Sequence, residues 1–160
     1  NNSNRYLEKT LQWGLLLDPK RVQDLVETRL MLESQNAGLA AQRFTRENLS
    51  MVERNLESME DLLEQPDHFL ECDLEFHLLI AQATQNTILY SLLSMTRGYL
   101  HEWVKGTLAR PIGEVTKRTK LSLQEHKTIF QAIRSGDAER AHHAMKEHIL
   151  SSSADLPSKA

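Results

Sequence analysis

The chain has 160 residues, of which 40% are hydrophobic and 26% are charged, and its formal net charge is −3. This length is typical of one domain with its own core, and the mild charge, without a cluster of Lys and Arg, argues against a surface that grips nucleic acid directly. Because Cys72 is the only cysteine, an internal disulfide and a cysteine-rich zinc module are excluded. No apolar run approaches the roughly 20 residues needed to span a bilayer, so we expect a soluble, cytoplasmic protein with no membrane partner.

Apolar residues recur at steps of three and four along most of the chain, which predicts helices rather than strands. Residues 1–18 are expected to form a linker or a short first helix that ends at Asp18-Pro19. The same spacing predicts six longer helices at about 19–42, 45–65, 66–84, 87–108, 114–135 and 137–150. We therefore predict an all-α fold, an antiparallel bundle of six to seven helices over residues 19–150, followed by a disordered tail at 151–160.

Two polar residues fall on the apolar face of the third of these longer helices. In "ECDLEFHLLIAQATQN", residues 71–86, Asp73 and His77 lie among Phe69, Phe76 and Ile80. Positions four apart differ by about 40° around a helix, so the two side chains project side by side from adjacent turns. A carboxylate buried without a partner is costly or becomes protonated. We therefore expect a compensating group close to Asp73.

Two more histidines occupy core positions of later helices. His126 continues the apolar series through Leu123 and Phe130, and His148 continues the series through Met145. One carboxylate and three imidazoles from three helices are ligands that suit zinc, nickel, manganese or iron. Because no thiolate takes part, the ion could also keep a position open for the oxygen of a ligand.

The alternative is that these histidines are ordinary core residues satisfied by hydrogen bonds. A single histidine on an apolar stripe is more often of this kind than a metal ligand. Three of them with an aspartate at four-residue spacing are harder to explain in this way, and the residues alone leave both interpretations open. The remaining histidines are expected at the surface or at helix edges: His68, His101, His142 and His143.

Arg29 lies inside the apolar run of the first long helix, one turn before Glu33. It could form an exposed helix ion pair worth only tenths of a kcal/mol. Alternatively, its guanidinium could bind the carboxylate of a ligand beside the metal. Arg97, with the neighbouring Tyr99, His101 and Trp103, could line the same pocket, or these residues could pack at a helix edge or a dimer face. Both alternatives stay open for each group.

Three segments together resemble a known family, the ligand-binding FCD domain of FadR-type GntR transcription regulators. "DLEFHLLIAQATQN" is similar to its D-x-x-x-H…N signature, and "VETRLMLESQNAGLAA" to its R-x-x-L-E…A-A opening. "EHKTIFQAIRSGDAERAHHAMKEHI" is similar to its E-H…A-I…G-D…A…M…H ending. Each segment is weakly specific alone, but the three in this order cover the chain from about Val22 to Ile149.

The resemblance implies a helical bundle that binds a divalent metal, zinc first among the candidates, through Asp73, His77, His126 and His148. It also implies a small organic acid effector, a carboxylic or hydroxy acid, with Arg29 at the carboxylate-binding position. We further expect Asn86 and Arg97 to bind the effector. In such regulators the domain follows a winged helix-turn-helix domain that binds operator DNA as a homodimer. Nothing before Val22 is long enough to form that domain, so we expect a fragment or a domain that acts alone.

These observations favour an effector-sensing domain of a transcription regulator, which is not an enzyme. The main alternative is a metal-dependent hydrolase or lyase that activates water at the same Asp/His site. It requires a general base, but Glu75 points about 200° away from Asp73 around the helix and Glu125 lies off the stripe of His126. A third alternative is a purely structural metal site in an interaction domain.

Overall fold

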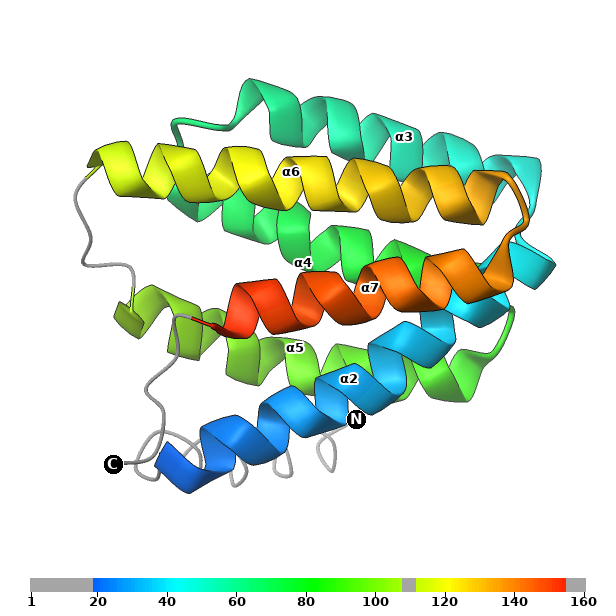
Figure 1. Cartoon of the computed structure of the whole chain (residues 1–160), viewed down its shortest axis with the longest axis horizontal. Coiled ribbons are helices and arrows are strands. Elements are labelled where there is room, and N and C mark those ends of the chain that lie inside the picture. The colour runs from blue at the N-terminus through cyan, green and yellow to red at the C-terminus, as the bar shows by residue number, and fades with distance from the viewer. Residues whose placement is uncertain (1–18, 108–111, 155–160) are drawn as a thin grey trace, which may run out of the picture.

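The computed structural model describes residues 19–107 and 112–154, which contain six α-helices and no strand. The helices follow one another in the predicted order: α2 (Pro19–Arg43), α3 (Arg46–Asp61), α4 (Pro66–Ala83), α5 (Thr87–Thr107), α6 (Ile112–Arg134) and α7 (Ala138–Ser153). In Figure 1, α2, α4 and α6 run in one direction and α3, α5 and α7 in the other. The prediction of an all-α fold is therefore confirmed, and the described helices form an antiparallel bundle.

The predicted chain ends are only partly described. The possible first helix at 1–18 lies outside the described residues, as do residues 155–160 of the predicted tail. Helix α7 continues to Ser153, so residues 151–153 of the segment predicted to be disordered are helical.

Short polar side chains fix where several helices begin. Thr45 and Asn48 form a reciprocal capping box at the start of α3, in which each side chain accepts a hydrogen bond from the other's backbone N–H. Asp137 caps α7, and Asn86 caps α5 by accepting from two backbone N–H groups of its first turn. Gly136, with φ at +73°, provides the left-handed residue that ends α6 before the tight turn to α7.

Helix α4 is the centre of the bundle and packs against α2, α3, α5 and α6. Helix α7 packs against α2 and α6, but its backbone makes no close approach to that of α4 within the described residues. The core between the helices contains fully buried apolar side chains from five of them, among them Ala37, Met59, Phe76, Ile80, Ile129, Met145 and Ile149. Burial of each large side chain stabilises the fold by roughly 1.5–3 kcal/mol. The packed core in turn fixes the polar residues that face inward from the same helices.

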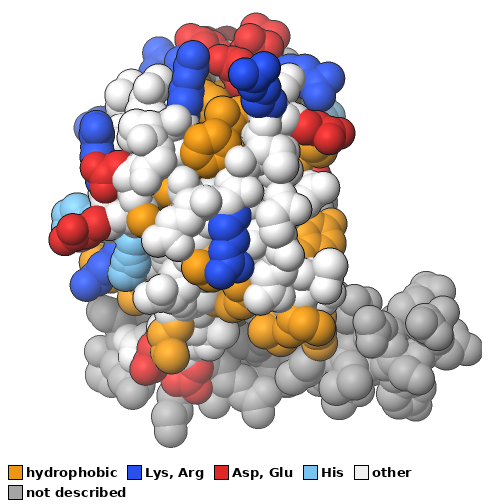
Figure 2. Space-filling view, turned by 90° about the vertical axis from the view of Figure 1, so that its right-hand side faces the viewer, with side chains coloured by type: hydrophobic (Ala, Val, Ile, Leu, Met, Phe, Trp, Pro, Cys, Tyr) orange, Lys and Arg blue, Asp and Glu red, His pale blue; other side chains and the backbone are white. Residues whose placement is uncertain are grey.

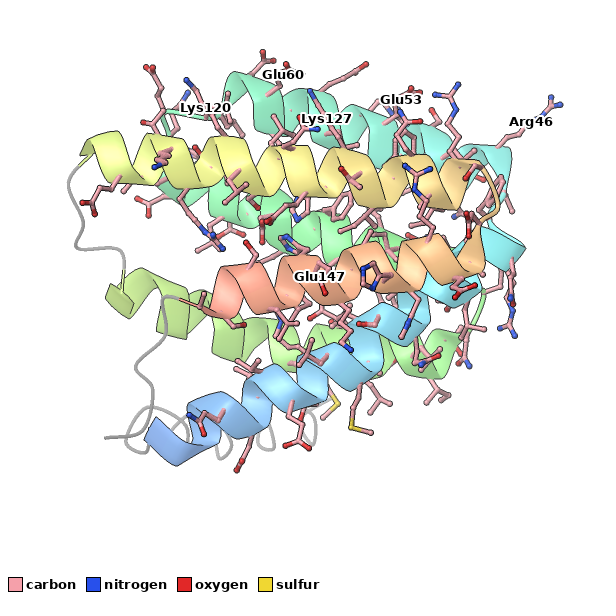
Figure 3. The ribbon with its side chains drawn as sticks, in the orientation of Figure 1. Arg46, Glu53, Glu60, Lys120, Lys127 and Glu147 are labelled. Carbon is pink, nitrogen blue, oxygen red and sulfur yellow. The ribbon has the colours of Figure 1, made fainter. Side chains whose placement is uncertain are left out.

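Ion pairs connect α3 to α6 on the outside of the bundle. Lys127 Nζ lies 2.9 Å from Glu60 Oε2, and Arg134 Nη1 lies 3.7 Å from Glu53 Oε1. Figure 3 labels Glu53 and Glu60 along α3 and Lys127 where α3 and α6 lie next to each other. Because three of the four side chains are more than half exposed and that of Lys127 is 39% exposed, each pair contributes at most about 1 kcal/mol. The core, rather than these pairs, holds α3 against α6.

The outer surface carries charges of both signs. Figure 2 shows basic and acidic side chains interspersed on the end of the bundle that faces the viewer, with hydrophobic side chains in separate small groups. No broad basic patch is visible on the described part of this face. Within the described ranges, no helix is long and apolar enough to cross a membrane.

Candidate metal centre

The structure brings together the four side chains that the sequence pattern singled out. Asp73 and His77 come from α4, His126 from α6 and His148 from α7, and one ligand atom from each lies within 4.8 Å of the others. The three histidines are at most 5% exposed, whereas the side chain of Asp73 is 21% exposed. Asp73 is therefore the most exposed member of the cluster.

The distances between the ligand atoms are suited to a single small cation. The Nε2 atoms of His126 and His148 lie 3.1 Å apart, and His126 Nε2 lies 3.5 Å from Asp73 Oδ1. His77 Nε2 lies 4.0 Å from Asp73 Oδ2. Two nitrogens bound to one tetrahedral zinc ion at about 2.0–2.1 Å would lie roughly 3.3 Å apart. Small side-chain adjustments would bring all four atoms onto one ion.

Two further observations fit a metal. Nε2 of His77 is buried and has no hydrogen-bond partner among the described residues, which is rare in proteins unless another group satisfies the atom. Burial, together with the nearby His148 and His77, holds the pKa of His126 well below its usual value. Burial also lowers the pKa of His148, although its hydrogen bond to Glu125 opposes the shift. Neutral imidazoles are the form that binds metal ions.

Other residues contact the four candidate ligands. Ser122 Oγ donates a hydrogen bond to Asp73 Oδ1 at 3.0 Å. The ring of Phe76 stacks on His126, with centroids 4.1 Å apart and planes at 16°. Glu125 Oε2 lies 2.8 Å from His148 Nδ1, within hydrogen-bond distance. Glu33 Oε2 lies 2.5 Å from His77 Nδ1, close enough for an ion pair, although the N–H direction departs from the line between the two atoms.

Sequence reasoning did not assign Glu33 or Glu125 to a ligand histidine. The available signal for Glu33 was its place on the buried face of an apolar helix, one turn after Arg29. Glu125 gave no such signal, because its partner His148 lies on another helix, 23 residues away in the sequence. Its carboxylate contacts Nδ1 of His148, on the opposite side of the ring from Nε2. Glu125 is therefore not presented to the ligand atoms as the general base that a hydrolase needs.

Arg29 pairs with Glu33, as one of the two predicted alternatives proposed. Its Nε lies 2.6 Å from Glu33 Oε1. The pair is buried, so the small free energy typical of exposed helix pairs does not apply to it. Burial alone would raise the pKa of Glu33, but Arg29 and His77 together outweigh burial and hold the pKa below its usual value. The contact uses Nε and does not require the terminal amino groups of the guanidinium.

The remaining predicted residues are not among the four clustered side chains, and several of their side chains lie outside the described residues. Asn86 is exposed and its side chain caps α5. Arg97 lies on α5, but its side chain is outside the described residues, as are those of Tyr99, His101 and Trp103. His68 and His143 are exposed and His142 is half-buried. The expectation of surface or edge positions is confirmed for these three histidines.

Comparison with known proteins identifies the family. The model of the FCD domain matches residues 24–151. The chain belongs to the FCD domain family. This match confirms the resemblance drawn from the sequence motifs and covers all four residues of the cluster.

Relatives of this FCD domain carry the names of transcription regulators. The chain is 30% identical to the HTH-type transcriptional regulator LutR of Bacillus subtilis over 89% of its own length and 65% of that protein. It is 30% identical to the galactonate operon transcriptional repressor of Escherichia coli, over 97% of the chain and 67% of the repressor. It is 32% identical to the putative L-lactate dehydrogenase operon regulatory protein of Escherichia coli, over 82% of the chain and 50% of that protein. The chain thus spans half to two thirds of these relatives.

Solved structures show the same FCD fold. Streptococcus agalactiae GntR superimposes with a TM-score of 0.71 at 31% identity, over 89% of this chain and 64% of that one. E. coli McbR/YncC gives a TM-score of 0.73 at 18% identity, over 88% of this chain and 66% of that one, and supports the fold alone. The family and the names of its members favour a regulatory domain over an enzyme.

Proposed function

We propose that this FCD domain senses a small carboxylic or hydroxy acid through a metal ion held by Asp73, His77, His126 and His148. The convergence of these four ligand atoms within 4.8 Å, in a domain whose relatives are regulators, carries the proposal. Galactonate and L-lactate, which occur in the names of two relatives, are both hydroxy carboxylates. An acid of this kind presents carboxylate and hydroxyl oxygens to a metal.

Three imidazoles and one carboxylate favour zinc, and nickel, manganese or iron would accept the same ligands. When bound, the ion would supply a Lewis-acidic centre for oxygen atoms of the effector. The effector would approach on the side of Asp73, because that ligand is the most exposed of the four. The three buried histidines close the opposite side.

Arg29 would bind the carboxylate of the effector. Its contact with Glu33 engages Nε, so the terminal amino groups can take part in a charge-assisted interaction with an acid. We propose Asn86 and Arg97 as further effector contacts. The described capping role of Asn86 would have to coexist with such a contact.

In the full-length regulator, effector binding would control a DNA-binding domain. We propose a cytoplasmic homodimer in which a winged helix-turn-helix domain binds operator DNA and this domain sets its position. The dimer would exchange between an arrangement that binds the operator and one that does not. The effector can shift this equilibrium only as far as it binds one arrangement more tightly than the other.

A thermal-shift experiment tests the proposal. Zinc should raise the melting temperature of the metal-free domain, and L-lactate or galactonate should raise it further only when zinc is present. His77→Ala combined with His126→Ala should abolish both shifts. The matched control replaces two exposed histidines, His68→Ala with His143→Ala, and should retain both.

The same experiment separates the alternatives. A zinc-dependent shift with no response to any small acid would indicate a structural metal site. Full zinc content and full acid response in the double variant of His77 and His126 would refute the site. Turnover of an ester or hydroxy acid by the zinc-loaded domain would point to the enzyme.

A further inference from the structure

Each imidazole has two nitrogens, and which of them binds a metal depends on what holds the other. For His148, the structure gives the two nitrogens different partners. Nδ1 lies 2.8 Å from Glu125 Oε2, and Nε2 lies 3.1 Å from His126 Nε2 inside the cluster. The Glu125 carboxylate can only accept a hydrogen bond when ionised, so it places the proton on Nδ1 and leaves the lone pair on Nε2.

His77 also faces a carboxylate from another helix. Its Nδ1 lies 2.5 Å from Glu33 Oε2, an ion-pair contact in which neither atom makes a well-directed hydrogen bond, and its buried Nε2 has no partner among the described residues. Glu33 is in turn held by Arg29 through its other oxygen. The Nε2 atom of His77 is therefore the one left to bind an ion.

His126 is oriented by packing instead. Its Nδ1 is buried and has no described hydrogen-bond partner, and its ring is stacked on Phe76. A carboxylate beside Nδ1 is therefore not common to all three histidines of the cluster. Glu33 and Glu125 are particular to two of the three rings.

We propose that Glu33 and Glu125 are positioning residues that present Nε2 of His77 and His148 to the ion; this inference rests on the proposed metal binding. Each carboxylate belongs to a different helix from its histidine: Glu33 on α2 holds a ligand of α4, and Glu125 on α6 holds a ligand of α7. Helix α2 thus contributes to the metal centre without supplying a ligand. Both carboxylates also offset the charge of a divalent ion in a buried site.

Metal affinity is the first test of this role. Zinc affinity, measured by competition with a chromophoric chelator, should fall about 10- to 100-fold in Glu125→Ala and in Glu33→Gln. Glu125→Gln keeps a carbonyl acceptor at the same place and should restore part of the loss. The matched control is Glu60→Gln, which removes a carboxylate that bridges α3 to α6 on the surface (Figure 3) and should bind zinc like the wild type.

Imidazole nitrogen NMR of the zinc-loaded wild type gives a second test that needs no variant. His77 and His148 should be bound through Nε2 and protonated at Nδ1. Glu33→Gln leaves Arg29 unpaired, and the variant could fail to fold. In that case the nitrogen of His77 that binds zinc in the wild type tests the role of Glu33. In Glu125→Ala, the tautomer of His148 should no longer be fixed and part of the protein should bind zinc through Nδ1, which a merely structural role of Glu125 would not cause.

The outcomes distinguish this inference from the proposed function. If the wild type binds zinc, but with Nδ1 ligation, or if the Glu125 variants bind it within twofold of the wild type, the positioning role is overturned and the metal site stands. If the wild type binds no divalent metal, the proposed function fails, and the positioning role fails with it.

Discussion

His126 and His148 bring their Nε2 atoms to 3.1 Å from each other, although they lie 22 residues apart on different helices. Both rings are buried and both pKa values are lowered. Without a metal, one ring must donate a proton to the other, and the neighbouring Nε2 of His77 is left without a partner. A cation that binds all three nitrogens would satisfy every one of these atoms at once.

The stability of the metal-free domain should fall as the pH is lowered from 7 to 5. The lowered pKa values of His126 and His148 mean that the unfolded chain takes up protons below about pH 6.5, whereas the folded protein does not. Each histidine then reduces the free energy of unfolding by up to about 1.4 kcal/mol per pH unit. Urea unfolding of the metal-free domain across this range measures the slope.

The control for this prediction is His126→Phe, which removes one of the two groups and should make the slope shallower. Saturating zinc should move the loss of stability to lower pH, because the ion competes with protons for the same nitrogens. A stability that is constant between pH 7 and 5 in the metal-free protein would contradict the lowered pKa values.

Phe76→Leu should weaken zinc binding more than an equivalent change elsewhere in the core. The substitution removes the ring that stacks on His126, so that the imidazole gains rotational freedom, and it should also cost about 1–2 kcal/mol of stability. Phe69→Leu, at a buried phenylalanine of the same helix with no described ring contact to a ligand histidine, is the control. Equal zinc affinity in the two variants would show that stacking does not orient His126.

Arg29→Gln should affect both stability and the response to acids, measured at a zinc concentration that still fills the site, because Arg29 also holds Glu33 beside His77. It leaves the buried Glu33 without its cationic partner, which should lower the free energy of unfolding by about 3 kcal/mol. It also removes the proposed carboxylate-binding group, so the acid-dependent thermal shift should disappear. Unfolding by urea and the thermal shift with L-lactate measure the two effects.

Arg29→Lys separates these two roles, because it keeps a positive charge near Glu33 but not the planar guanidinium. It should recover part of the stability and little of the acid response. A response of wild-type size in Arg29→Gln would exclude Arg29 from the effector site.

Asn86→Ala should reduce stability by about 1 kcal/mol, because two backbone N–H groups at the start of α5 lose their acceptor. Asn86→Asp retains an acceptor oxygen and should preserve the cap. If Asn86 also contacts the carboxylate of an effector, the aspartate would repel it and the acid-dependent shift would fall. An unchanged shift in Asn86→Asp would leave the residue with its capping role alone.

The inward direction of the four ligands could be predicted from the sequence, because each lies within a regular apolar series on its own helix. His126 between Leu123 and Phe130 is an example, and all three residues are buried. The spacing of Asp73 and His77 likewise predicted that the two would be neighbours. The family resemblance added that the three helices meet at one place, which periodicity within a single helix cannot establish.

The partners of the ligands could not be predicted, for a physical reason. Periodicity gives the direction of a side chain around its own helix axis, but not which residue of a neighbouring helix lies at the same height. Glu125 points about 100° away from His126 and so looked unrelated to the site, yet it reaches His148 on α7. The pairing depends on how far α6 and α7 are shifted along each other, which the packing of the whole core determines.

The lack of a close backbone approach between α4 and α7 gives the imidazoles between them a mechanical role. The rings of His77 and His148, with centroids 5.2 Å apart, lie between these two helices. If the proposed ion binds both rings, labels attached to α4 and α7 should report a change in separation when a chelator removes it. Metal occupancy would then be recorded as a distance between helices.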